Sequence, residues 1–113
     1  MTMMTRSEND YYNIIDSSGF HLIVLGDRND QWTEEVLKLL AEEEVHVDFF
    51  PWCDVVDLRL QLELVSYPVI QLWISGRLKT EYVGYHCEAL KNLIHSVKGQ
   101  LYANATKGHG VLD

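Results

Sequence analysis

Ser66-Tyr67-Pro68-Val69-Ile70-Gln71-Leu72-Trp73-Ile74 is the stretch that decides the fold of this chain. From residue 69 onward, apolar side chains fall on both faces of an extended segment, which is typical of a strand covered on both sides. Ser75-Gly76 is a tight-turn signal, and residues 78–85 then place apolar residues among polar ones. The pattern predicts a central strand and an antiparallel hairpin partner that ends at Gly84.

The rest of the chain alternates between short apolar runs and helical patterns. Asp30 is a suitable N-cap for a helix, because its carboxylate can accept a hydrogen bond from a free amide of the first turn. The final helix has apolar residues spaced by three and four, at Leu90, Leu93, Ile94, Val97 and Leu101. Before the hairpin we predict strand, helix, strand and helix at residues 21–25, 30–44, 45–50 and 54–65.

Residues 54–65 carry two competing patterns. Four leucines alternate strictly with polar residues, which indicates a strand, while a second apolar set fits a helical stripe at Val55, Leu58, Leu62 and Val65. We predict a helix, because parallel strands on either side need a crossover and the polar residues here are good helix formers.

Length and composition indicate one folded domain. The chain has 113 residues, of which 47% are hydrophobic and 23% charged, the balance of an ordinary globule. We place the domain at residues 20–102, after an N-terminal arm or short helix at 1–19 and before a flexible C-terminal tail at 103–113.

The net charge of −8 comes from 17 acidic against 9 basic residues. Phosphate backbones would be repelled, so we expect no nucleic-acid partner, although an acidic mimic of nucleic acid is conceivable. A solvated acidic surface explains the charge, as does attraction to a basic protein segment. The sequence shows neither a membrane-spanning run nor a secretory signal, so we expect no membrane partner and a cytoplasmic location.

Three local features, together with the order of elements, resemble the thioredoxin-like superfamily over residues 20–98. They are Tyr67-Pro68 before an apolar strand, the turn at residues 75–77, and Val83-Gly84-Tyr85 before the last helix. The resemblance implies an α/β fold in which helices cover both faces of a mixed four-stranded sheet, ordered β-α-β-α-β-β-α, with a possible extra N-terminal helix. It also implies that the Tyr67–Pro68 peptide bond is cis and that Pro68 faces the start of the helix predicted at residues 30–44, which is the first helix of the family's fold.

In that family, the start of the first helix carries a Cys-x-x-Cys motif, and here the matching positions read Asp30-Gln31-Trp32-Thr33. The family's nucleophile is a thiolate, whose pKa is lowered by the helix N-terminus. Asp30 and Thr33 form a degenerate redox motif that cannot supply it. Ordinary dithiol exchange is therefore not expected, and the sequence favours a protein that is not an enzyme.

The two cysteines leave an alternative open. Cys53 follows the second strand, at the same end of the sheet as the degenerate motif, and Cys87 lies in the first turn of the last helix. Either could serve a monothiol or glutathione-linked oxidoreductase, since residues 84–88 partly resemble the glutathione-holding stretch of glutaredoxins. An unreactive structural thiol is the favoured interpretation for both, and the histidines form no metal-site pattern, so we expect no metal and no cofactor.

The binding hypothesis depends on aromatic residues at the same end of the sheet. Trp32, Trp52, Tyr67 and Pro68 could form an exposed surface there, although burial in the core is equally compatible with the aromatic residues. We therefore predict a redox-inactive protein-binding, assembly or chaperone-like module whose partner carries a basic segment. We expect a monomer or a weak homodimer, with residues 45–50 as the candidate edge strand.

Overall fold

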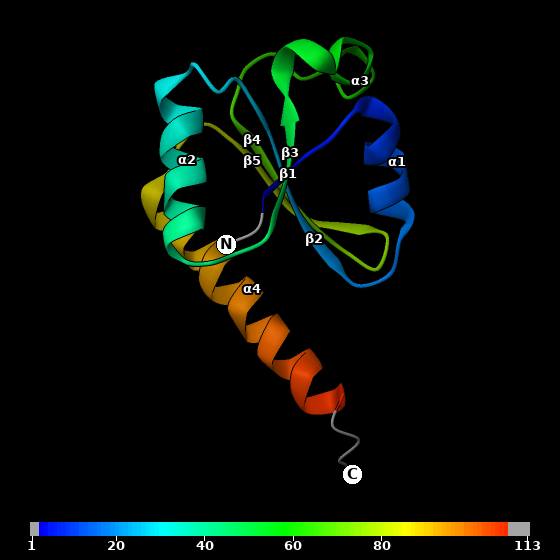
Figure 1. The fold of residues 1–113 in the computed structure, drawn as a ribbon, viewed down its shortest axis with the longest axis vertical. Coiled ribbons are helices and arrows are strands. Elements are labelled where there is room, and N and C mark those ends of the chain that lie inside the picture. The colour runs from blue at the N-terminus through cyan, green and yellow to red at the C-terminus, as the bar shows by residue number, and fades with distance from the viewer. Residues whose placement is uncertain (1–2, 109–113) are drawn as a thin grey trace.

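The computed structural model describes residues 3–108 and contains a central sheet with helices on both faces (Figure 1). Its elements, in chain order, are β1 (Met3–Thr5), α1 (Glu8–Asp16), β2 (Phe20–Gly26), α2 (Gln31–Glu42), β3 (Val47–Pro51), a 3-10 turn (Trp52–Asp54), α3 (Val56–Gln61), β4 (Val69–Ile74), β5 (Arg77–Val83) and α4 (Cys87–Gly108).

The predicted strand and helix order from residue 20 onward is confirmed, and so is the N-terminal helix. The strands lie in the order β1-β3-β2-β4-β5, with β2 parallel to β3 and antiparallel to β4. The sheet is mixed, as predicted, but has a fifth strand, β1, which pairs parallel to β3. Three residues are too short to produce an alternation signal, so the sequence did not reveal this strand.

Because β1 pairs with β3, the prediction that residues 45–50 form an edge strand is wrong. Arg6, directly after β1, donates its backbone amide to the Phe49 carbonyl at 2.8 Å and its Nε to Asp48 at 3.1 Å. These contacts fasten the N-terminal segment along β3. The two edges of the sheet are β1 and β5.

Strand β5 is an edge with a built-in irregularity. Leu72 of β4 pairs with Thr80, but the next residue, Trp73, pairs with Leu78, so Lys79 is an extra residue in β5. A β-bulge and a lysine on an edge strand both oppose pairing with another chain.

Each face of the sheet has its own apolar core. α1 and α3 cover one face, where Tyr11, Phe50 and Leu58 are buried together. α2 and α4 cover the other face, where Val36, Leu40 and Leu90 are among the buried residues. Figure 1 shows the two layers as α2 and α4 on the left and α1 on the right, with α3 at the upper end of the sheet.

Two predicted boundaries need correction. The helix expected over 54–65 is confirmed only for Val56–Gln61, because a 3-10 turn precedes it and a left-handed residue, Glu63, ends it. The flexible tail predicted at residues 103–113 is wrong for residues 103–108, since α4 passes through Gly99 and continues to Gly108. Alanines between residues 103 and 105 favour that continuation, and residues 109–113 lie outside the described part.

Helices α2 and α3 end in the same way. After α2, Val45 donates its amide to the Leu40 carbonyl at 3.1 Å, and Glu44 between them has φ +57°. After α3, Leu64 donates to the Arg59 carbonyl at 2.9 Å, and Glu63 also has φ +57°. Both are Schellman endings, in which glycine is the favoured left-handed residue and glutamate is not.

Replacement of Glu44 by glycine should therefore stabilise the protein. A left-handed conformation costs an L-residue roughly 1–2 kcal/mol, and the greater backbone entropy of glycine offsets part of this, which leaves a gain of about 0.5–1 kcal/mol. Urea unfolding of Glu44→Gly checks this, with Lys38→Gly in the middle of α2 as the control. The control should lose about 1 kcal/mol, and a loss in both variants would contradict the assignment.

A buried polar network fastens α1 to β4 and β5. The Gln71 side-chain oxygen accepts hydrogen bonds from the Tyr11 hydroxyl at 2.8 Å and from Trp73 Nε1 at 2.9 Å. The Gln71 amide nitrogen donates to Glu81 at 2.6 Å. Burial raises the pKa of Tyr11 to about 12. The network satisfies a glutamine that would otherwise be costly to bury.

We expect Tyr11→Phe to lower the free energy of unfolding at pH 7 by about 1 kcal/mol, because a buried hydrogen bond is lost. The folded pKa of Tyr11 lies above the ordinary value of 10.0, so its stabilising effect is complete below pH 10 and is lost as the pH rises toward about 12. Tyr11→Phe should therefore also flatten the fall of stability above pH 10, measured by urea unfolding across pH. Tyr67→Phe, at a half-exposed ring outside the network, is the control; equal effects in both variants would refute a special role for the network.

Candidate functional site

The candidate site lies at the end of the sheet where α2 begins. In Figure 1 this is the upper end, where the first turn of α2 and helix α3 both lie. The loop between β2 and α2 supplies Asp30 and leads to Trp32 and Thr33. The Tyr67–Pro68 peptide bond is cis, and it leads directly into β4.

Asp30 and Thr33, the two residues of the degenerate motif, are joined by hydrogen bonds. One carboxylate oxygen of Asp30 accepts from the Thr33 amide at 2.8 Å and from the Thr33 hydroxyl at 3.0 Å. The predicted N-cap is thus confirmed. The two side chains meet within hydrogen-bond distance, and Thr33 is fully buried. A carboxylate and a hydroxyl in this arrangement stabilise the helix start and offer no thiolate.

Gly26 makes the burial of Thr33 possible. A Cβ atom on Gly26 would lie 2.6 Å from both Thr33 Oγ1 and Thr33 Cγ2, closer than non-bonded atoms approach. The last residue of β2 must therefore be glycine for Thr33 to occupy this position. The strand predicted from the sequence ended at residue 25, so no local pattern pointed to a role for Gly26.

Trp32 is the most exposed aromatic residue of the site. Its side chain is 50% exposed, and its ring stacks on Tyr85 with centroids 5.8 Å apart and planes inclined by 14°. Tyr85 lies in the connection between β5 and α4. The sequence analysis did not include Tyr85 among the binding residues, because no spacing rule links residue 85 to residue 32.

The hydroxyl of Tyr85 interacts with Cys87, the first residue of α4. This side-chain hydrogen bond is the largest cause that raises the pKa of Tyr85, and partial desolvation adds to it. The negative charges of Glu35 and Glu42 raise it further. Trp32, Tyr85 and Cys87 therefore form one cluster, with α2 carboxylates close enough to act on it electrostatically.

Trp52 and Tyr67 form a second pair, with ring centroids 5.0 Å apart and an inclination of 65°. Trp52 is only 8% exposed, and the Arg59 guanidinium lies over its ring at 4.8 Å. Pro68 is buried as well, and its carbonyl accepts the Gly84 amide at 2.7 Å. Of Trp52, Tyr67 and Pro68, only Tyr67 is half-exposed, so Trp52 and Pro68 support the site from below and do not form its surface.

Both cysteines are free thiols, with Cys53 exposed and Cys87 half-buried. Cys53 lies in the 3-10 turn after β3, as predicted for that end of the sheet. Within residues 3–108, no group of three or more histidine, cysteine or acidic side chains is arranged to hold a metal ion. In the same part of the chain, no helix combines the length and hydropathy needed to cross a bilayer.

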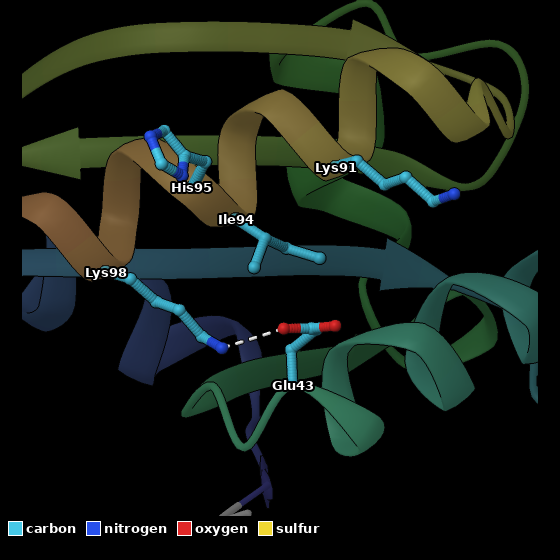
Figure 2. Close-up of a pocket in the computed structure, with 5 residues that line it drawn as sticks. All are labelled: Glu43, Lys91, Ile94, His95 and Lys98. Carbon is cyan, nitrogen blue, oxygen red and sulfur yellow. Dashed lines mark hydrogen bonds and ion pairs between the residues drawn. The ribbon is translucent and has the colours of Figure 1, made fainter.

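A surface hollow of about 350 Å³ lies away from this site, between the end of α2 and the middle of α4 (Figure 2). Lys98 Nζ contacts the Glu43 carboxylate there at 2.7 Å, across the floor formed by Ile94. Figure 2 shows Lys91 and His95 pointing in other directions along α4, so these two side chains do not converge on one point. The contact ties two helices together and defines no binding site.

Comparison with known proteins identifies the fold. The architecture first defines an α/β protein with a β1-β3-β2-β4-β5 sheet, a cis-proline before β4 and helices on both faces. Solved thioredoxins then match it closely: the oxidised thioredoxin of Plasmodium falciparum has a TM-score of 0.70 at 15% identity, covering 85% of this chain and 98% of that one. Spinach chloroplast thioredoxin f has a TM-score of 0.69 at 13% identity, and the match covers 86% of this chain and 94% of that one. Reduced Schistosoma mansoni thioredoxin has a TM-score of 0.71 at 8% identity, and the match covers 85% of this chain and 98% of that one.

This chain therefore has the thioredoxin-like fold, as the sequence resemblance predicted. No protein-family model and no curated protein sequence matches it. Identities this low establish the fold alone, so the function must be argued from the site.

The contact between Gly26 and Thr33 can be tested by a double-mutant cycle. We expect Gly26→Ala to lower the free energy of unfolding by about 1–3 kcal/mol, because the new methyl group overlaps the Thr33 side chain. In the Thr33→Ala background the two atoms at 2.6 Å are gone and only the Cβ atom at 3.2 Å stays close, so the same change should cost about 1 kcal/mol less. Chemical unfolding of the four proteins measures the coupling. Strictly additive effects would show that the two residues do not constrain each other.

Proposed function

We propose that this chain is a redox-inactive thioredoxin-like protein that binds a segment of a partner protein and serves in assembly or in a chaperone-like role. The observation that carries the proposal is the direct hydrogen bond between Asp30 and Thr33 at the positions of the Cys-x-x-Cys motif. Disulfide exchange requires a thiolate that attacks a disulfide sulfur. Neither side chain can do so, whereas the Trp32 side chain of the same helix turn is exposed and available for binding.

The aromatic site consists of Trp32, Tyr67 and Tyr85 in this proposal. Trp32 is exposed but already held in one orientation by its stack on Tyr85, so little side-chain entropy would be lost on binding. Tryptophan and tyrosine anchors of this kind supply much of the binding energy at protein interfaces. Val83, 42% exposed, pairs with Val69, two residues after Tyr67, so a further apolar side chain is exposed at this end of the sheet.

The charge around the aromatic site favours a basic partner segment. Glu35 and Glu42 are near enough to Tyr85 to raise its pKa, and the whole chain carries a net charge of −8. Complementary charge increases association rates and selects among partners. The same charge disfavours nucleic acid, so the proposed partner is a protein, and the proposed location, the cytoplasm, agrees with two free cysteines.

One observation favours a second candidate function, a monothiol oxidoreductase. Cys53 is exposed, and Cys87 lies at a helix start in contact with the Tyr85 hydroxyl, so both thiols could be reached by a substrate disulfide or by glutathione. The attacking thiolate would form a mixed disulfide and release the other sulfur as a thiolate. This candidate requires one reactive thiol, which distinguishes it from the binding function.

Thiol chemistry separates the two candidates. We expect no catalysed insulin reduction in the presence of dithiothreitol or glutathione, and no selective alkylation of either cysteine by a limiting amount of iodoacetamide at pH 7. Cys53→Ser and Cys87→Ser should behave as the unmodified protein does, and an active thioredoxin serves as the positive control. Turnover that disappears in one serine variant would contradict redox inactivity and assign the nucleophile.

Binding itself is tested by selection from phage-displayed random peptides. Selected extended peptides should bind the protein about tenfold more weakly when Trp32 or Tyr67 is changed to alanine, because an aromatic anchor is lost. Tyr12→Ala, at an exposed tyrosine on α1, is the matched control and should leave their affinity unchanged. Failure to enrich any peptide, or equal losses in all three variants, would overturn the proposed site.

A further inference from the structure

Helix α3 presents a second apolar surface that the aromatic site does not include. We define the α3 patch as Val56, Leu60 and Val65, which are 48%, 72% and 93% exposed. Val56 and Leu60 are four residues apart and share one side of the helix, while Leu58, on the opposite side, is buried in the core. Val65 follows the helix, four residues after its last residue, Gln61. These three side chains contribute little to the hydrophobic core, and large exposed apolar side chains concentrated in one short segment favour an interface.

The patch is held in a fixed conformation. α3 has only six residues, too few to be stable in isolation, but both of its ends are fastened. At the start, the Glu8 carboxylate from α1 accepts the Leu58 amide at 2.6 Å. Tyr12, also from α1, donates its hydroxyl to the Gln61 side chain, and the Schellman ending at Glu63 completes the helix. A surface held in this way loses little entropy when a partner docks.

The charges around the patch are acidic. Asp54, Asp57 and Glu63 are all exposed within the same segment. Arg59, the only cation of residues 53–66, has its guanidinium over the Trp52 ring. A second copy of this chain would bring a net charge of −8 toward an acidic surface, which opposes self-association. Charge complementarity thus selects a basic partner.

The shape of the surface selects the form of that partner. The backbone amides of a helix are used within the helix, so α3 offers no strand edge for an extended peptide. Its outward side chains form a ridge, and ridges pack well into the groove of another helix. We infer that the α3 patch docks an amphipathic helix of a partner protein, with an apolar stripe bordered by lysine or arginine. This inference rests on the proposed binding function but uses a different surface from the aromatic site.

The experiment uses a synthetic helix of about 18 residues, long enough to span several turns, with a leucine stripe bordered by lysines. Backbone amide shifts of the ¹⁵N-labelled full chain are followed during titration. We expect changes centred on residues 53–66 and an affinity about tenfold weaker in the Leu60→Gln/Val65→Thr variant. Leu78→Gln, at an exposed leucine of β5, is the matched control and should bind as the unmodified protein does.

Two comparison peptides and one sedimentation measurement make the result decisive. A peptide with glutamates in place of the lysines, and a scrambled peptide without an apolar stripe, should both bind at least about tenfold more weakly. The inference would be overturned if the amide shifts did not change at millimolar peptide, or if the patch variant bound the peptide with the affinity of the unmodified protein. Amide shift changes confined to Trp32 and Tyr85 would also overturn it. So would concentration-dependent self-association, measured by sedimentation, that disappears in the patch variant, because the occupant would then be a second copy.

The outcomes for the two surfaces remain distinguishable. The phage-selected extended peptides should still bind the Leu60→Gln/Val65→Thr variant and should lose affinity for the Trp32→Ala variant. That result would support the aromatic site independently of whether the amphipathic helix binds. If neither kind of peptide binds the unmodified protein, the proposed binding function and the α3 inference both fail.

Discussion

The junction between β2 and α2 is the constraint on which the rest of the structure depends. β2 is the middle strand of the sheet, and its last residue, Gly26, leaves room for the Thr33 side chain. The Asp30 carboxylate then binds both the amide and the hydroxyl of Thr33 and fixes the first turn of α2. That turn carries Trp32, so one cap determines both where the helix starts and where the exposed indole lies. The position that supplies a nucleophile in thioredoxin-like redox proteins supplies helix stability here.

Each face of the sheet supports one of the two proposed binding surfaces. On the α2 and α4 face, the core supports the first turns of those helices, where Trp32 and Tyr85 stack. On the other face, α1 is fastened to β4 through Gln71 and to α3 through Glu8. The second set of bonds allows α3 to keep Leu60 exposed without loss of order, since the fixed ends replace the burial that a short helix would otherwise need. Both proposed binding surfaces are thus rigid parts of the fold.

Sequence reasoning worked best where one physical cause dominated. The hairpin of β4 and β5 follows from two-sided burial and a tight turn, and the start of α2 follows from the Asp30 cap. It was less accurate over residues 54–65, where the predicted helical stripe is buried at Val55 and Leu58 but exposed at Leu62 and Val65, because α3 ends at Gln61 and both residues follow it. Apolar character predicts burial only while the helix continues. Likewise Trp52 was a candidate surface residue, yet the Tyr67 and Arg59 side chains cover it.

The sequence by itself determined the order of the elements from residue 20 onward and the α/β architecture with helices on both faces of the sheet. It also showed that residues 30–33 contain no Cys-x-x-Cys pair. Each of these depends on neighbouring residues or on a repeating period along the chain. Only the tertiary structure decided which residues form the surface of the site. The stack of Trp32 on Tyr85 and the capping of α3 by Glu8 join residues about fifty positions apart. Strand β1 lies beside β3 for the same reason. Such contacts arise from how the layers pack, and no local pattern along the chain encodes them.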